Sequence, residues 1–242
     1  MLRFQNITKR FSNQTVIDAL DLELPFQGVT FIMGPSGAGK SVLAQLAVGL
    51  LRPDSGHIEL DGVAIENLHE RQWRARRAEL GYVTQGPALL DWLTLRENVA
   101  LGPVRVRRVS KREALERADA ALAQVGLAEV ADRRPSEVGP GTQKRTSVAR
   151  ALACGPRALV YDEPTTGLDP RSARQVDDLI ADAARRGTAA IVVSHDLASA
   201  ERTAQRTLVL HKGRVGYDGP ASGLKASNSP AATALLERGE DG

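Results

Sequence analysis

The sequence lacks features that several common classes of protein need. It contains one cysteine, Cys154, which rules out an internal disulfide and suits a reducing compartment. Aromatic residues make up 4% of the chain and the formal net charge is +3, so a dedicated nucleic-acid binder is not expected. The sequence has neither a run of eighteen apolar residues nor a signal-peptide pattern at the N-terminus. We therefore expect a soluble, cytoplasmic protein that reaches any membrane through a partner.

The remaining composition is that of a globular protein. Hydrophobic residues account for 42% of the 242 residues, which is enough to bury a full core in one α/β domain with a small subdomain. Two basic runs, residues 71–77 and 105–112, fit solvated helix or loop faces, because charge runs usually are solvated. A position near anionic lipid headgroups is the alternative interpretation of these runs.

Residues 34–41 read Gly-Pro-Ser-Gly-Ala-Gly-Lys-Ser and match the phosphate-binding loop G-x-x-x-x-G-K-[ST]. An apolar run at 29–33 precedes them and a helical pattern follows them, as the motif requires. The glycines allow backbone N–H groups to face a phosphate, and the helix N-terminus adds partial positive charge. We expect Lys40 to reach the β- and γ-phosphates and Ser41 to ligate Mg²⁺. The predicted nucleotide-binding residues are Gly34, Pro35, Ser36, Gly37, Ala38, Gly39, Lys40, Ser41 and Val42.

The segments before and after this loop have contrasting patterns. Residues 2–8 and 15–24 alternate apolar and polar side chains, which predicts antiparallel strands with Phe11 in the loop between them. The helix after the phosphate loop is predicted to run to about Leu51, where a Pro, Asp, Ser and Gly cluster stops it.

Helical spacing dominates the middle of the chain. Residues 94–124 are predicted to be helical, with Ser110 as an N-cap within that stretch. A loop rich in Pro and Gly follows at 132–141, and a further helix is predicted over 143–153. For residues 220–242, two interpretations stay open, a partly disordered terminus or a segment that contacts a partner.

Polar residues follow three of the predicted buried strands. Asp162 and Glu163 follow the apolar run 157–161, where one carboxylate can hold Mg²⁺ while the other addresses an attacking water. His195 follows the buried strand 188–193, where an imidazole can donate to a γ-phosphate oxygen. Gln85 stands where the chain leaves a strand predicted over 80–84.

In their order, these elements resemble the nucleotide-binding subunit of ABC transporters, and the resemblance covers nearly the whole chain. It implies an α/β P-loop NTPase with a RecA-like core, an antiparallel β subdomain and an inserted helical subdomain at about residues 86–156. The ATP-binding domain would span residues 1–224 and be followed by a C-terminal tail at 225–242.

The resemblance also implies ATP and Mg²⁺ as cofactors and in-line attack of water on the γ-phosphate. It places an aromatic ring on adenine and a D-loop at residues 167–170, Gly-Leu-Asp-Pro. The residues implied for catalysis are Lys40, Gln85, Glu163 and His195. Those implied for the metal are Ser41, Gln85 and Asp162. Those implied for ATP contact outside the phosphate loop are Phe11, Gly139, Gly141 and Asp169.

One motif departs from the family's pattern. The signature helix of the family begins with Leu-Ser-Gly-Gly-Gln, whereas the matching residues 138–142 here are Val-Gly-Pro-Gly-Thr. Gly139 replaces the serine hydroxyl, and Pro140 has no N–H to donate. In the family this stretch closes on the γ-phosphate held by the other subunit. We therefore expect slow hydrolysis by a homodimer, or pairing with a second ATPase whose signature is intact.

A subfamily resemblance rests on softer features, namely Gly-Lys-Ser-Val-Leu at 39–43, the run 85–101 and the tail 229–242. These look like the ATPases of Mla and Mce phospholipid-trafficking systems. That resemblance implies a membrane permease, a lipid-binding MCE protein, a small regulatory subunit and a place on the cytoplasmic face of the inner membrane. The alternatives are another cargo, such as a lipoprotein, a drug or an amino acid, or a non-transport or regulatory ABC ATPase.

Overall fold

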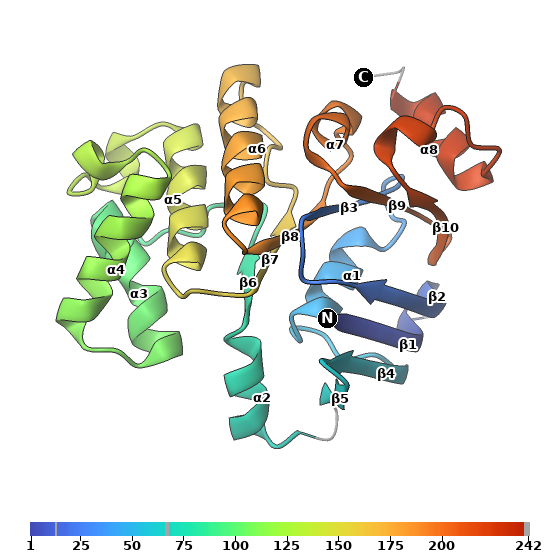
Figure 1. Cartoon of the computed structure of the whole chain (residues 1–242), viewed down its shortest axis with the longest axis horizontal. Helices are drawn as coiled ribbons and strands as arrows, with labels where there is room; N and C mark the ends of the chain where they lie inside the picture. Colours follow the sequence, from blue (N-terminus) through green and yellow to red (C-terminus); the bar gives the residue numbers. More distant parts are fainter. Residues whose placement is uncertain (13, 66–67, 240–242) are drawn as a thin grey trace.

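The computed structural model describes residues 1–12, 14–65 and 68–239, and these form two sheets with helices around them (Figure 1). The antiparallel sheet has the strand order β2-β1-β4-β5. Alternate side chains of β2 are buried, as expected for a sheet with one solvated face. Its strands are β1 (Leu2–Phe11), β2 (Gln14–Leu24), β4 (Ser55–Leu60) and β5 (Val63–Ala64).

This sheet differs in two places from what the sequence predicted. Phe11 does not lie in a loop, because it is the last residue of β1 and pairs with Gln14, the first residue of β2. The short strand β5, which pairs with β4, was not predicted. Two residues are too few to produce a period-two pattern, so the sequence carries no signal for it.

The larger sheet has the order β10-β9-β3-β8-β7-β6, and its central strands run parallel. Every residue of β3, β7 and β8 is buried because elements cover both faces, and this explains their uninterrupted apolar sequences. The edge strand β10 runs antiparallel to β9. The strands are β3 (Val29–Met33), β6 (Leu80–Val83), β7 (Ala158–Asp162), β8 (Ala189–Val193), β9 (Arg206–His211) and β10 (Arg214–Gly219).

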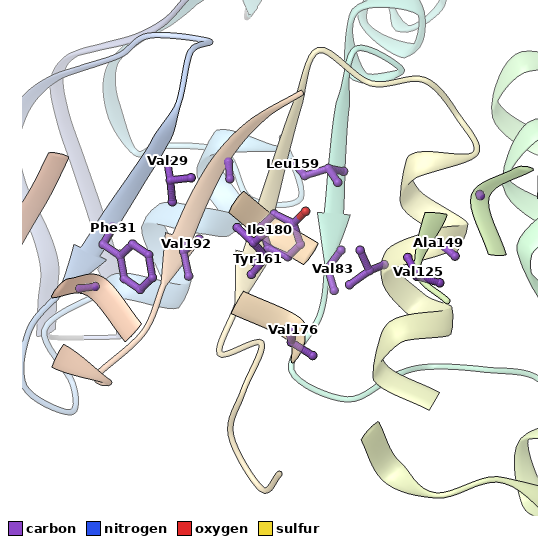
Figure 2. Packing of buried hydrophobic residues seen from close by; sticks show 14 of the residues in the cluster. Val29, Phe31, Val83, Val125, Ala149, Leu159, Tyr161, Val176, Ile180 and Val192 are labelled. Atoms are coloured by element: carbon purple, nitrogen blue, oxygen red, sulfur yellow. The ribbon is translucent and has the colours of Figure 1, made fainter. Parts of the chain in front are cut away.

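Two apolar clusters fill the space on the two faces of the parallel sheet. In one, side chains of α1 (Lys40–Ala47) pack between this sheet and the antiparallel sheet. In the other, Phe31, Tyr161 and Val192 of the central strands meet Val176 and Ile180 of the following helix (Figure 2). That helix is α6 (Pro170–Arg185), and α7 (Leu197–Thr203) lies on the same face.

The helix after the phosphate loop is shorter than predicted. It ends at Ala47 rather than near Leu51, because Gly49 adopts a left-handed φ of 68°. A side chain at that glycine would also collide with the ring of Trp73, which lies on α2 (Glu70–Arg77). The close approach of α2 therefore requires glycine two residues past the helix end.

A group of helices lies between β6 and β7 in the sequence and stands to one side of the sheet in Figure 1. The predicted helical stretch 94–124 is interrupted, because Pro103 cannot continue the hydrogen-bond ladder and Arg108 takes a left-handed φ of 56°. Ser110 caps the second helix through the backbone N–H of Glu113, as predicted. The helices are α3 (Leu95–Gly102), a π-helical turn (Pro103–Arg107), α4 (Lys111–Gln124), short 3₁₀ turns (Ala128–Val130 and Pro135–Glu137) and α5 (Pro140–Leu152).

The C-terminal residues pack against their own chain. After a 3₁₀ turn (Ala221–Gly223), α8 (Pro230–Gly239) lies on β9 and β10, with Ala231, Ala232 and Leu235 buried. Residues 230–239 are therefore a helix with an apolar face in the core, which differs from a disordered terminus. Over the described ranges, no helix combines the length and apolarity that a membrane span requires.

Candidate nucleotide-binding and hydrolysis site

The phosphate loop joins the end of β3 to the start of α1. Gly34, Gly37 and Gly39 have φ values of 146°, 80° and 95°, which side-chain-bearing residues rarely adopt. A Cβ at Gly34 would lie 2.3 Å from the carbonyl oxygen of Leu210, so the loop is pressed against β9. Pro35, Ser36 and Ala38 complete the loop, and Val42 lies in the first turn of α1.

Lys40 lies along this loop. Its Nζ donates hydrogen bonds to the carbonyl oxygens of Gly34, at 2.8 Å, and Pro35, at 3.2 Å. Burial lowers the pKa of Lys40, while the negative charges of Glu163 and Asp162 act in the opposite direction. The lysine ammonium is therefore held on the backbone of the phosphate loop, within electrostatic reach of both carboxylates.

Oxygen ligands suited to Mg²⁺ lie beside the loop. The Ser41 hydroxyl donates to Oδ1 of Asp162 over 3.0 Å, and the hydroxyl of Tyr82 donates to Oδ2 over 2.9 Å. Burial and the neighbouring Asp162 raise the pKa of Tyr82, so its hydroxyl stays a donor. A hydroxyl and a carboxylate at this spacing fit the hard-oxygen preference of Mg²⁺. Gln85, the third residue predicted for the metal, has an exposed side chain.

Glu163 follows β7 and makes two polar contacts through one oxygen. Its Oε2 accepts from the hydroxyl of Thr166 at 2.8 Å and lies 2.9 Å from Nδ1 of His195. The backbone of Glu163 has a left-handed φ of 49°, and its N–H donates to the carbonyl of Val193 on β8. A carboxylate held from both sides on a strained backbone fits a fixed catalytic position.

Two predicted contacts lie at the ends of other elements. Phe11 closes β1 with 44% of its surface exposed, and Nζ of Lys9 lies 5.5 Å from the ring centroid. Asp169 is the N-cap of α6, where its carboxylate accepts from the N–H groups of Arg171 and Ser172, each at 3.0 Å. Hydrogen bonds from Ser172 and Arg171 hold the pKa of Asp169 below its usual range.

The altered signature segment forms the N-terminus of α5. This helix begins at Pro140, three residues before the predicted start, because proline fits the first helical position. Gly139 is the N-cap and supplies no side-chain cap. A Cβ at Gly139 would meet nothing within 4 Å, whereas a Cβ at Gly141 would lie 2.7 Å from Oγ of Ser172 on α6. There is therefore room for a side chain at Gly139, whereas Gly141 packs against Ser172.

The structure brings part of the predicted set together. Lys40, Ser41, Asp162, Glu163 and His195 form one cluster at the carboxyl ends of β3, β7 and β8. Within the described part of the chain, no hydrogen bond or ion pair joins Phe11, Gly139 or Asp169 to this cluster.

Three residues near this cluster were not predicted. Tyr82 and Thr166 hold the two carboxylates, and Lys144 donates from α5 to the backbone just after β6. In the sequence, a tyrosine on an edge strand and a lysine inside a helical pattern are most simply interpreted as structural residues. Their position beside the site depends on how β6 and α5 pack, which the sequence does not indicate.

Comparison with known proteins agrees with this P-loop ATPase architecture. The family model described as ABC transporter matches residues 17–166, and the chain belongs to this family. A dimeric structure of the ATP-binding cassette MJ0796, bound to ADP and Pi after hydrolysis, is 28% identical with a TM-score of 0.81, over 91% of this chain and 99% of that one. The predicted fold class is confirmed: the protein has the fold of an ABC ATPase cassette.

Relatives with similar full-length matches are transport proteins. The glutamine transport ATP-binding protein GlnQ of Escherichia coli K12 is 39% identical over 219 residues, covering 90% of this chain and 91% of GlnQ. The phosphonates import ATP-binding protein PhnC 1 of Rhodopseudomonas palustris HaA2 is 39% identical over 234 residues, covering 93% and 83%. The L-cystine transport system ATP-binding protein TcyN of Escherichia coli K12 is 33% identical, covering 98% and 97%. The protein is an ATP-binding subunit and an ATPase, with ATP and Mg²⁺ as its cofactors.

Proposed function

We propose that this ATPase powers a membrane permease that imports an amino acid or a similarly small polar solute. The observation that carries the proposal is the match to GlnQ, which extends over nine-tenths of both chains at 39% identity. The similarity to TcyN, an amino acid transport protein as well, supports the same choice. The relatives described above thus favour the amino acid alternative over the predicted phospholipid cargo. An organic phosphonate is the next candidate, because of the similarity to PhnC 1.

The proposed chemistry assigns a task to each residue of the cluster. The phosphate loop and Lys40 bind the β- and γ-phosphates and stabilise their charge, while Ser41 and Asp162 hold Mg²⁺. Glu163 orients and polarises the attacking water. His195 contributes in two ways, by fixing the carboxylate of Glu163 and by donating to the γ-phosphate. Mg²⁺, when bound, neutralises charge that develops on the phosphate oxygens.

The proposed assembly is a head-to-tail pair of ATPase subunits on the cytoplasmic side of a permease. Gly139, Gly141 and the N-terminus of α5 would approach the nucleotide of the partner, where the helix dipole favours negative charge. Without a serine hydroxyl, this contact is weaker than in the family pattern. A homodimer with slow turnover and a heterodimer with an intact partner signature are both compatible with this geometry.

The experiment is cargo-stimulated ATP hydrolysis by the chain reconstituted in vesicles with the permease encoded beside it and that permease's solute-binding protein. We expect glutamine, cystine or another amino acid to raise ATP hydrolysis several-fold, with methylphosphonate tested in parallel. Stimulation by a lipid-binding MCE protein and phospholipid, with none by the polar solutes, would replace the amino acid proposal by the phospholipid one. The small regulatory subunit implied by the phospholipid-trafficking resemblance is expected only if that second result is obtained.

A further inference from the structure

Lys144 is a buried lysine on the helix that carries the signature segment. Only 3% of its surface is exposed, although lysine is almost never fully buried without a partner. Its Nζ donates to the backbone carbonyl oxygens of Thr84, at 3.1 Å, and Gln85, at 2.6 Å. Its partners are therefore two successive carbonyls of the segment that carries Gln85, a residue implied by the family resemblance for catalysis and the metal.

Arg150 makes the same kind of contact further along α5. Its guanidinium donates to the carbonyl oxygens of Pro87, at 3.1 Å, and Ala88, at 2.6 Å. Ala88 has a left-handed φ of 47°, a conformation that alanine adopts only where its surroundings hold it. We call residues 84–88 the Gln85 loop.

The Gln85 loop begins where hydrogen-bonded pairing between β6 and β7 ends. The last residue of β6 paired with β7 is Val83. From Thr84 to Ala88, each of five successive backbone carbonyls accepts a hydrogen bond from a side chain. The carbonyl of Gly86, which neither cation reaches, accepts from the hydroxyl of Thr84 over 2.7 Å. Four of the five bonds come from the two cations of α5. The side chain of Gln85 itself stays exposed, so the loop presents it from an anchored backbone.

Lys144 also interacts electrostatically with the two carboxylates of the hydrolysis site. Burial lowers its pKa to about 8, and the charges of Asp162 and Glu163 act against that decrease. The same two carboxylates act on the pKa of Lys40 from α1 and of Lys144 from α5. The loop anchor and the catalytic carboxylates lie within electrostatic reach of each other.

We propose that Lys144 and Arg150 are positioning residues that join the Gln85 loop to α5, so that the loop and the signature segment move as one body. The inference rests on the proposed function, which brings residues 139–141 to the nucleotide of the partner, and on the catalytic role that the family resemblance implies for Gln85. Lys144 stands one helical turn after Pro140, so a displacement of the signature segment by a partner's nucleotide is passed directly to Gln85. The two cations thereby link the nucleotide of one subunit to that of the other.

Hydrogen exchange of the nucleotide-free protein tests the anchor without any ATP turnover. In Lys144→Met, which keeps the side-chain length and removes the donors, we expect the amides of residues 84–86 and 88–90 to exchange at least about tenfold faster, Pro87 having no amide hydrogen. Amides of α1 and β7 should be unchanged. Lys111→Met is the matched control, because Lys111 is an exposed lysine at the start of α4. Arg150→Lys, a milder second variant, should loosen residues 87–88 more than residues 84–85.

Kinetics test the consequence for the reaction. We expect kcat for ATP hydrolysis in Lys144→Met to fall about tenfold while KM for ATP changes less than about twofold, because the phosphate loop is untouched. Lys144→Arg keeps the donors and should recover part of both the protection and the rate.

Two results would overturn the proposal. Unchanged exchange over residues 84–90 in both Lys144→Met and Arg150→Lys would show that these cations do not hold the loop. Faster exchange throughout the chain would show that Lys144 stabilises the whole protein rather than this loop in particular. If the parent protein fails to hydrolyse ATP, the proposed function fails, but the exchange data still decide the role of Lys144.

Discussion

At the scale of single residues, Glu163 is the most constrained group in the site. Thr166 and His195 contact the same carboxylate oxygen, and a bond to Val193 fixes its backbone. Such a carboxylate has one orientation, which a catalytic base needs and a merely structural surface residue does not. The geometry therefore leads to a direct test by an isosteric change.

Glu163→Gln should lower kcat for ATP hydrolysis about a hundredfold to ten-thousandfold, because the amide keeps the shape but cannot accept a proton. Binding of ATP, measured by equilibrium titration with a fluorescent ATP analogue, should stay within about twofold, since the phosphate loop is unchanged. Glu201→Gln, on the exposed part of α7, is the control. Turnover equal to that of the parent protein would remove Glu163 from the role of base.

Gly139→Ser should raise ATP hydrolysis, because it restores a hydroxyl at the signature position in a place with room for a side chain. Loss of one donor aimed at transition-state charge costs about a hundredfold in comparable sites, so we expect a gain of at least about tenfold. Gly139→Ala adds the Cβ without the hydroxyl and should leave the rate near that of the parent. Equal rates for all three proteins would mean that this position does not face the nucleotide.

The sequence indicated which residues would lie near one another where they stand at strand ends or inside a spaced motif. Asp162, Glu163 and His195 stand at or just after the ends of buried strands, and Ser41 follows the phosphate loop, so their meeting at one sheet edge could be anticipated. Lys144 could not be, because its partners are carbonyls some sixty residues away whose position depends on how α5 packs on β6. The roles of the predicted residues remain proposals that these substitutions test.

At the scale of elements, α6 and α7 are joined by an ion pair between a buried aspartate and an exposed arginine. Asp177 on α6 is 2% exposed and accepts from Ser199 and Arg202 of α7, each over 2.5 Å. Asp169 is the N-cap of α6, and α7 begins two residues after His195, so the ion pair connects the two helices that follow these predicted site residues.

Asp177→Ala should destabilise the protein by about 2 kcal/mol, because it removes two hydrogen bonds to a buried carboxylate and leaves the buried Ser199 hydroxyl without its acceptor. The melting temperature should fall by about 4 to 8 °C for a chain of this size. Asp178→Ala changes the exposed neighbour on the same helix and is the control. A calorimetric scan in which both variants melt together would show that the pair contributes little.

Element boundaries were predicted less well than element types. The end of α1 depends on Gly49 making room for Trp73, and a contact between two distant segments has no signature in a local window. The break between α3 and α4 carries a local signal, Pro103, which the strong helical spacing on both sides outweighed. In both cases tertiary packing or a single proline decided the outcome against periodicity.

At the scale of the whole molecule, the proposed head-to-tail assembly places Gly139 at the nucleotide of a partner subunit. With ATP and Mg²⁺, Glu163→Gln should therefore form a dimer of about twice the monomer mass, measured by light scattering during size exclusion, and ADP should leave it monomeric. Gly139→Ser in the same background should lower the ATP concentration needed. A monomer under all these conditions would favour a heterodimer with a second ATPase.

The order of strands in the parallel sheet was available only through the family resemblance. Alternation and apolar runs identified the strands, but β3 lies between β8 and β9, which follow it by more than a hundred residues. Pairing over that distance is set by the packing of α1 and α6 on opposite faces, which periodicity does not encode. The core composition therefore indicated the α/β class, and the motifs in their order identified the fold.

Two glycines of the signature segment look alike in the sequence but face different constraints. Gly139 borders open space, and Gly141 lies against Ser172. In a library with random codons at both positions, selected only for folded protein, position 139 should accept many amino acids and position 141 almost none besides glycine. Adding a selection for ATP turnover should then enrich serine at 139. The degenerate signature would thus be one codon change from greater activity, within reach of ordinary natural variation.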